Sequence, residues 1–224
     1  FEACVLDLID AALTAYDLPS NAVRTVNHGT TVATNAVLER RGARTALVTT
    51  VGFRDVLELR RVRAPQIYDL FFQKPPILVD RYLRHELGER IAADGSVLAP
   101  VSEVELETIV EVLRRESVES VAVCLLHAYA HPQHEEEAGD YLRLHLPGIP
   151  VTLSSEVLAE RREYERTATT SVNAYVRPVM HHYLNALDTG LKTKGIDAPL
   201  VIMQSAGGLT PASAAALRPV FCLE

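Results

Sequence analysis

The chain has 224 residues, a formal net charge of −7 and 48% hydrophobic residues, which is typical of a globular protein and excludes a disordered one. The acidic balance argues against a nucleic-acid-binding surface, and no apolar run approaches the roughly 20 residues that span a bilayer. The three cysteines are widely spaced and form no C-x-x-C pair, as is typical of reduced thiols. We therefore expect a cytoplasmic protein that binds neither nucleic acid nor membranes.

Short apolar runs alternate along the chain with longer segments of helical periodicity. In chain order, we predict a helix over 2–16, a strand over 23–26, a helix over 32–41, a strand over 45–50, a helix over 103–114, a strand over 121–126, a helix over 134–145, a strand over 150–153, helices over 164–175 and 179–192, a strand over 200–203 and a helix over 211–217. This alternation is typical of an α/β fold with a mostly parallel sheet.

Two stretches interrupt the alternation. Residues 81–98 alternate polar and apolar side chains around Asp94-Gly95, which predicts an antiparallel hairpin. Residues 64–76 contain three prolines and several aromatic residues, which predicts an irregular loop.

Polar groups are concentrated in residues 28–35, between a predicted strand and a predicted helix. The candidate ligand-contacting residues of this segment are His28, Gly29, Thr30, Thr31, Thr34 and Asn35. The free N–H groups of a first helical turn favour an anion or a polar molecule, which Thr30, Thr31 and Asn35 would hold while His28 acts as an acid or base. The alternative is that a threonine only caps the helix.

A second polar segment follows the predicted strand over 200–203. Ser205, Gly207 and Gly208 lie at the carboxyl end of this strand, where glycines let the backbone approach a ligand. The alternative is a tight turn between secondary structure elements. The segment lacks the complete pattern of a P-loop.

Charged residues cluster at 161–166, and histidines at 127–134. The charged cluster is either a solvated helix face or a group of residues that contact the ligand-contacting side chains rather than the ligand itself. His127, His131 and His134 have a helical spacing, but Pro132 interrupts the helix, so we predict no metal site.

Six segments resemble, in the same order, those of the hydantoinase A/5-oxoprolinase family. They are residues 28–60, 121–127, 153–157, 163–167, 173–176 and 204–205. The resemblance implies a partial actin-like ATPase lobe, similar to ribonuclease H, with a mostly parallel sheet and an antiparallel hairpin insertion. It divides the chain into an amino-terminal region over 1–153 and the start of the core region over 154–224. It also implies that Glu165, Arg166 and Asn173 support the ligand-contacting residues.

The function implied by the resemblance is that of an ATP-dependent cyclic amidase, which hydrolyses a cyclic amide such as 5-oxoproline or a hydantoin. ATP and Mg²⁺ would be its cofactors. A hydantoinase B-type subunit or fused domain would be its partner, in an oligomer. An ATP-dependent ketone carboxylase subunit is the alternative, because such subunits share the architecture.

The sequence also departs from the family pattern. Ala206 stands where the family usually has Asn, and Arg177 stands where it has Gly. The family's first phosphate loop would precede Phe1, and a second glycine-rich phosphate segment would follow the last residue. We therefore expect a piece of a longer enzyme that by itself is a catalytically inactive structural module.

Overall fold

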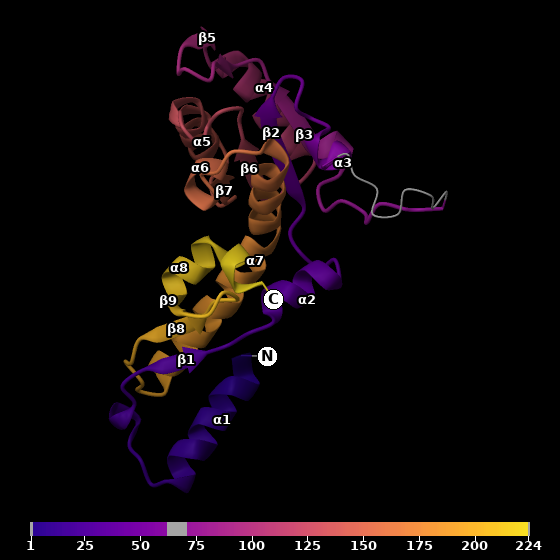
Figure 1. Cartoon of the computed structure of the whole chain (residues 1–224). Coiled ribbons are helices and arrows are strands. Elements are labelled where there is room, and N and C mark those ends of the chain that lie inside the picture. The colour runs from indigo at the N-terminus through magenta and orange to yellow at the C-terminus, as the bar shows by residue number, and fades with distance from the viewer. Residues whose placement is uncertain (1, 62–70, 224) are drawn as a thin grey trace. The chain divides into compact units, whose positions relative to one another are not determined.

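A computed structural model describes residues 2–61 and 71–223 (Figure 1). These residues form two compact units, the first from residues 1–42 and 176–224 and the second from residues 43–175. The predicted division into 1–153 and 154–224 follows sequence motifs rather than contacts, and it stays a prediction.

The first unit is built on a small sheet in the order β1-β8-β9. Its elements are α1 (Glu2–Ala15), η1 (Ser20–Ala22), β1 (Val26–His28), α2 (Val32–Leu38), residues 176–193 of α7 (Glu163–Thr193), β8 (Leu200–Met203), β9 (Leu209–Pro211), α8 (Ala212–Leu217) and η3 (Pro219–Cys222). Strands β1 and β8 are parallel, with His28 opposite Ile202, whereas β9 runs antiparallel to β8.

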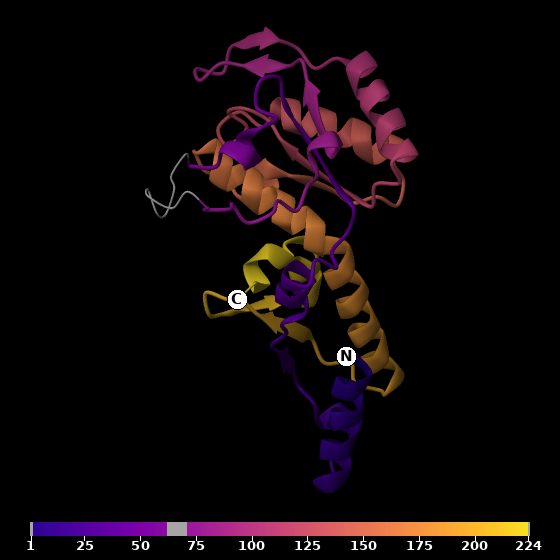
Figure 2. The same cartoon turned by 90° about the vertical axis from the view of Figure 1, so that its right-hand side faces the viewer.

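Two helices of the first unit lie side by side. Met180, Leu184, Leu187 and Leu191 recur at helical spacing on α7 and are all buried, which gives this part of α7 an apolar stripe. Helix α1 lies beside the end of α7 (Figures 1 and 2), where Leu6 packs so closely on Gly190 that any larger residue would displace it.

The second unit contains a parallel sheet in the order β3-β2-β6-β7. Its elements are β2 (Thr45–Thr50), α3 (Val56–Leu59), η2 (Arg81–Leu83), β3 (Arg84–Leu87), β4 (Arg90–Ile91), β5 (Val97–Ala99), α4 (Glu103–Arg115), β6 (Ser120–Cys124), α5 (Gln133–His145), β7 (Val151–Leu153), α6 (Ser154–Val157) and residues 163–175 of α7. Every residue of β2, β6 and β7 is buried, as expected for parallel strands that are covered on both faces.

Helices complete the core of the second unit. Helix α4 contributes Leu106, Ile109, Val110 and Leu113, and α5 contributes Ala138 and Leu142. The chain passes from β2 to β3 on one side of β2, and then crosses to β6 on the other side of β2. The order therefore reverses beside β2, which is where open parallel sheets usually bind ligands.

Most predicted elements are present with small changes of bounds. The strands over 45–50 and 200–203 are confirmed at both ends, whereas the strand predicted over 23–26 lies at Val26–His28 because it pairs with β8 there. The antiparallel hairpin is confirmed only for β4 and β5, around Gly95 at φ 88°. Residues 84–87 form instead the parallel strand β3.

The two helices predicted over 164–175 and 179–192 are wrong as separate elements, because α7 continues through Pro178. An internal proline removes one hydrogen bond and costs about 3 kcal/mol. Buried apolar residues on both sides of it, including Val176 and Met180, outweigh that cost. In the predicted loop over 64–76, residues 64–70 lie outside the described part, and residues 71–76 form no helix or strand.

Candidate functional site

The first unit brings the two predicted polar segments to one edge of its sheet. Strand β1 ends at His28 and β8 ends at Met203, and the two strands run parallel with His28 opposite Ile202. The loops that follow, residues 29–31 and 204–208, therefore leave the sheet at the same carboxyl edge. Ligands of parallel sheets bind at such edges.

His28 is held at this edge by Tyr183 of α7. The Nε2 atom of His28 lies 2.8 Å from the Tyr183 hydroxyl, and the two ring centroids are 5.9 Å apart. Burial lowers the pKa of His28, so its imidazole is neutral near pH 7. Burial also raises the pKa of Tyr183, while a hydrogen bond with the Thr30 side chain acts in the opposite direction. His28, Tyr183 and Thr30 thus form a chain of uncharged hydrogen-bonding groups.

The helix that follows this cluster is capped by a threonine in part. The Thr30 hydroxyl accepts a hydrogen bond from the Val32 N–H group at 3.2 Å, so capping and the polar cluster share this side chain. Thr31 occupies the N-cap position without a capping bond of its own, and the Asn35 amide contacts its hydroxyl at 3.4 Å. Helix α2 has only seven residues, so its dipole contributes little, and any ligand contact depends on the side chains. Thr34 is half-buried on α2.

The loop after β8 is a closed turn with exposed glycines. Gly207 and Gly208 have φ values of 80° and 115°, which require glycine, and the space beside both is open. The Ser205 amide and hydroxyl both donate to the Phe221 carbonyl oxygen at 3.0 Å. The tight-turn alternative is therefore correct for the backbone, and the glycines still leave it accessible. A ligand-binding role for this loop stays a prediction.

The three predicted supporting residues all lie in the second unit. Arg166 is fully buried, so the alternative of a solvated helix face is wrong for it. Its guanidinium donates to the Ser154 hydroxyl at 2.8 Å and pairs with Glu163. Glu165 pairs with Arg61, and Asn173 is buried. Because His28 and Ser205 belong to the first unit, the supporting role of these residues stays a prediction.

Buried polar side chains fill the carboxyl edge of the second sheet, and no spacing pattern in the sequence indicates them. The Glu135 carboxylate accepts hydrogen bonds from the Leu125 amide, the Ser154 hydroxyl, and both the amide and hydroxyl of Ser155. It also lies 3.7 Å from the Arg166 guanidinium. Burial raises the pKa of Glu135, and the four donors act against that shift.

A second buried group lies at the reversal point beside β2. The Thr50 hydroxyl donates to Glu89 and accepts from the Leu126 amide, and Glu89 lies 2.6 Å from Nδ1 of His134. These side chains satisfy one another's hydrogen-bonding groups at the position where open parallel sheets commonly have a ligand-binding crevice. The second unit therefore uses this position for internal hydrogen bonding.

Within residues 2–61 and 71–223, no group of three or more histidine, cysteine, aspartate or glutamate side chains is arranged to hold a metal ion. Over the same residues, no helix combines the length and the apolar character needed to cross a membrane.

Comparison with known proteins assigns the family. Residues 1–146 match the hydantoinase/oxoprolinase N-terminal region, and residues 166–224 match the hydantoinase/oxoprolinase family. The chain is 37% identical to the caprolactamase subunit alpha of Pseudomonas jessenii, over 82% of this chain and 27% of that protein. It is 32% identical to 5-oxoprolinase 1 of Arabidopsis thaliana, over 88% of this chain and 17% of that protein. It is 30% identical to the acetophenone carboxylase gamma subunit of Aromatoleum aromaticum, over 84% of this chain and 28% of that protein. It thus spans less than a third of the length of these relatives.

A solved structure supports the same assignment. The crystal structure of the ATP-dependent caprolactamase from Pseudomonas jessenii superposes with a TM-score of 0.81 at 35% identity, over 86% of this chain and 28% of that one. The predicted fold class, a partial actin-like α/β lobe with a mostly parallel sheet and an antiparallel hairpin, is confirmed. The chain belongs to the hydantoinase/oxoprolinase family.

Proposed function

We propose that this chain supplies the substrate-facing part of an ATP-dependent cyclic amidase. One observation carries the proposal: the parallel register of β1 and β8 places the loops after His28 and Met203 at one sheet edge. The names of the relatives support it, since they include a caprolactamase subunit and a 5-oxoprolinase. The substrate would be a small cyclic amide such as 5-oxoproline, a hydantoin or a lactam.

Ring opening of such an amide adds water across the C–N bond and yields a carboxylate and a released N–H group, which is an amine for a lactam or 5-oxoproline and a ureido group for a hydantoin. The reaction needs a polarised carbonyl oxygen and a proton for the leaving nitrogen. Tyr183 engages Nε2 of His28, so Nδ1 is the ring nitrogen left to meet a substrate. If Tyr183 donates to Nε2, Nδ1 carries the proton and polarises the carbonyl. In the other tautomer, Nδ1 accepts a proton from water.

The polar side chains at this edge suit a neutral ring better than a nucleotide. The imidazole of His28, the hydroxyls of Thr30, Thr31 and Ser205, and the Asn35 carboxamide are uncharged near neutral pH. A triphosphate needs cationic groups or Mg²⁺ against its charge, and these side chains provide none. We therefore assign ATP and Mg²⁺ to the whole protein and to none of these residues.

A B-type subunit or fused domain would complete the enzyme, since the caprolactamase relative is named as a subunit. The second candidate is a subunit of an ATP-dependent ketone carboxylase. It is favoured by the 30% identity to the acetophenone carboxylase gamma subunit, which is close to the identity with 5-oxoprolinase 1.

The decisive experiment measures ATP hydrolysis by the whole protein with its partner subunit. The assay offers 5-oxoproline, hydantoin, caprolactam or acetophenone with bicarbonate, and it quantifies the ring-opened or carboxylated product. Stimulation by a cyclic amide supports the amidase, and stimulation by the ketone supports the carboxylase. If no compound stimulates ATP hydrolysis, both candidates are refuted.

Two variants test the residues of the site. We expect His28→Asn to lower the stimulated rate on the order of a hundredfold, as for loss of an acid–base group. Tyr183→Phe keeps the ring but loses the hydrogen bond to His28, and we expect a smaller loss of roughly tenfold. The matched controls are the exposed residues His182→Asn and Tyr16→Phe, which should keep the full rate.

A further inference from the structure

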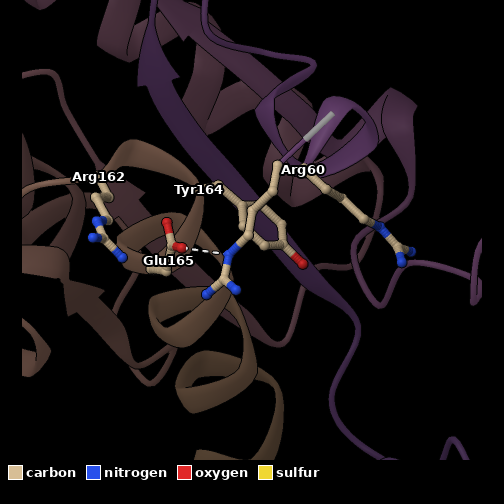
Figure 3. A pocket seen from close by; sticks show the side chains of 5 residues that line it. Arg60, Arg162, Tyr164 and Glu165 are labelled. Atoms are coloured by element: carbon tan, nitrogen blue, oxygen red, sulfur yellow. Dashed lines mark hydrogen bonds and ion pairs between the residues drawn. The ribbon is translucent and has the colours of Figure 1, made fainter. Parts of the chain in front are cut away.

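A basic cavity lies in the second unit, between the end of α3 and the start of α7. It has a volume of about 450 Å³ and is lined by Arg60, Arg61, Arg162, Tyr164 and Glu165 (Figure 3). Small-molecule sites commonly have volumes of roughly 300–1,000 Å³. The cavity is therefore large enough for a small ligand, and its lining is unusually rich in arginine.

The positive charge of this lining exceeds its negative charge. Among the described residues of the lining, Glu165 is the one carboxylate, and its Oε1 atom lies 2.6 Å from Nε of Arg61. The pair uses Nε, and within the described residues no acceptor lies at the two terminal nitrogens of Arg61. In the described part of the chain, the Arg162 guanidinium has no hydrogen-bonded partner or ion pair. Glu165 thus pairs directly with Arg61, whereas the charge of Arg162 acts on this carboxylate from a longer distance and, after a backbone hydrogen bond and Arg61, helps to lower its pKa.

The side chains surround a common space. Figure 3 shows Glu165 between Arg162 and Tyr164, and its dashed line marks the ion pair that Glu165 forms with Arg61. The Arg60 guanidinium points away from Glu165. Arg60 donates to the Pro75 carbonyl oxygen instead. Arg61 and Arg162 are therefore the two cations that face the carboxylate from separate parts of the chain.

The backbone at two of the arginines has an unfavourable conformation that the surrounding structure must hold in place. Arg162 has a φ of 76° and Arg60 has a φ of 56°, a region that costs free energy for residues other than glycine. Residues held in such conformations cluster at ligand sites. The N–H groups of the first turn of α7, which has 31 residues, add partial positive charge beside Arg162.

We propose that this cavity binds the oxyanion of a small molecule, a phosphate or a carboxylate, between Arg61 and Arg162. Two guanidinium groups suit such oxyanions because they donate paired hydrogen bonds. Glu165 is then an internal anion that competes with the ligand for Arg61. The proposal concerns the second unit alone and does not depend on the amidase reaction.

Because Glu165 competes with the ligand, removing its charge should raise the affinity for the anion, whereas removing an arginine should lower it. Binding of inorganic phosphate and of succinate to the intact protein is measured by titration calorimetry at low ionic strength. We expect Glu165→Gln to raise the affinity about threefold to tenfold, because the internal competitor is removed. We expect Arg162→Gln to lower it on the order of tenfold. The control Arg115→Gln removes an equal charge from an exposed position on α4 and should change nothing.

Each outcome decides the proposal. Preference for phosphate or for succinate, with the expected effects of both variants, supports a phosphate or a carboxylate ligand respectively. Absence of binding of either anion overturns the proposal. An affinity that Arg162→Gln leaves unchanged, or that Arg115→Gln lowers equally, also overturns it. Circular dichroism verifies that each variant is folded, and since no enzymatic turnover is measured, failure here leaves the amidase proposal untouched.

Discussion

Replacing Glu135 by glutamine should strongly destabilise the protein. The side chain is fully buried, and its two oxygens accept from the amides of Leu125 and Ser155, each at 2.9 Å, and from two serine hydroxyls. In glutamine, an NH₂ group replaces one oxygen, so one of the two backbone amides must face a donor. A buried donor left without an acceptor costs about 1–3 kcal/mol.

The lost charge adds to this cost. Arg166 is also fully buried and lies 3.7 Å from Glu135, so among the described residues it would keep Glu163 as its one ion-pair partner. Breaking a buried charged pair by removing one partner costs about 3–5 kcal/mol. We therefore expect Glu135→Gln to lower the free energy of unfolding by about 3–5 kcal/mol in total, because the two effects overlap.

Urea denaturation at pH 7, followed by circular dichroism, measures this change. The control is Glu136→Gln, the next residue on α5, which is exposed and should change the free energy by less than about 0.5 kcal/mol. A loss below about 1 kcal/mol for Glu135→Gln would refute the reasoning. If that variant does not fold, Ser155→Ala removes a single hydroxyl donor at 2.8 Å and should cost about 1 kcal/mol.

Three further outcomes are expected. Burial raises the pKa of Cys124 to about 11, so this thiol should resist a disulfide reagent at pH 8 while exposed Cys4 reacts; fast labelling that persists in Cys4→Ser would contradict this. His28 should titrate below its ordinary pKa of about 6.5 by NMR. Because the unfolded chain then binds more protons than the folded one, the contribution of His28 to the free energy of unfolding is complete above pH 6.5 and falls at lower pH. A titration midpoint of His28 at or above pH 6.5 would contradict this. Gly208→Ala, at φ 115°, should cost about 1–2 kcal/mol in urea denaturation, whereas no loss would show that the turn relaxes.

The two sheets use their carboxyl edges differently. In the second unit, the edge beside β2 is filled by side chains such as Thr50 and Glu89 that bond to one another. In the first unit, the corresponding edge exposes Gly29 and the glycines after Ser205, with open space beside each glycine. The polar side chains of the first edge are also hydrogen-bonded, but the open space beside its glycines leaves the backbone accessible to a ligand, which favours the first unit for the proposed substrate contacts.

Some of the fold could be predicted because its causes are local. The strand Thr45–Thr50 consists of β-branched and apolar residues, and Leu200–Met203 is an apolar run between Pro199 and Gln204, and the sequence alone located their ends. Helix α4 was predicted to within one residue, because Ser102 caps it and apolar residues recur at helical spacing. Pro178 gave the wrong prediction, since the packing that outweighs its cost is not visible in a local pattern.

The sequence by itself determined the α/β class, the family resemblance and the two polar segments around His28 and Ser205, because each depends on neighbours in the chain. Only the tertiary structure decided that these segments share a sheet edge, through the pairing of β1 with β8 across more than 170 positions. It alone brought Tyr183 to His28, and Arg61 to Glu165 beside Arg162. Contacts between residues far apart in sequence follow from strand order and helix packing, which no local periodicity encodes.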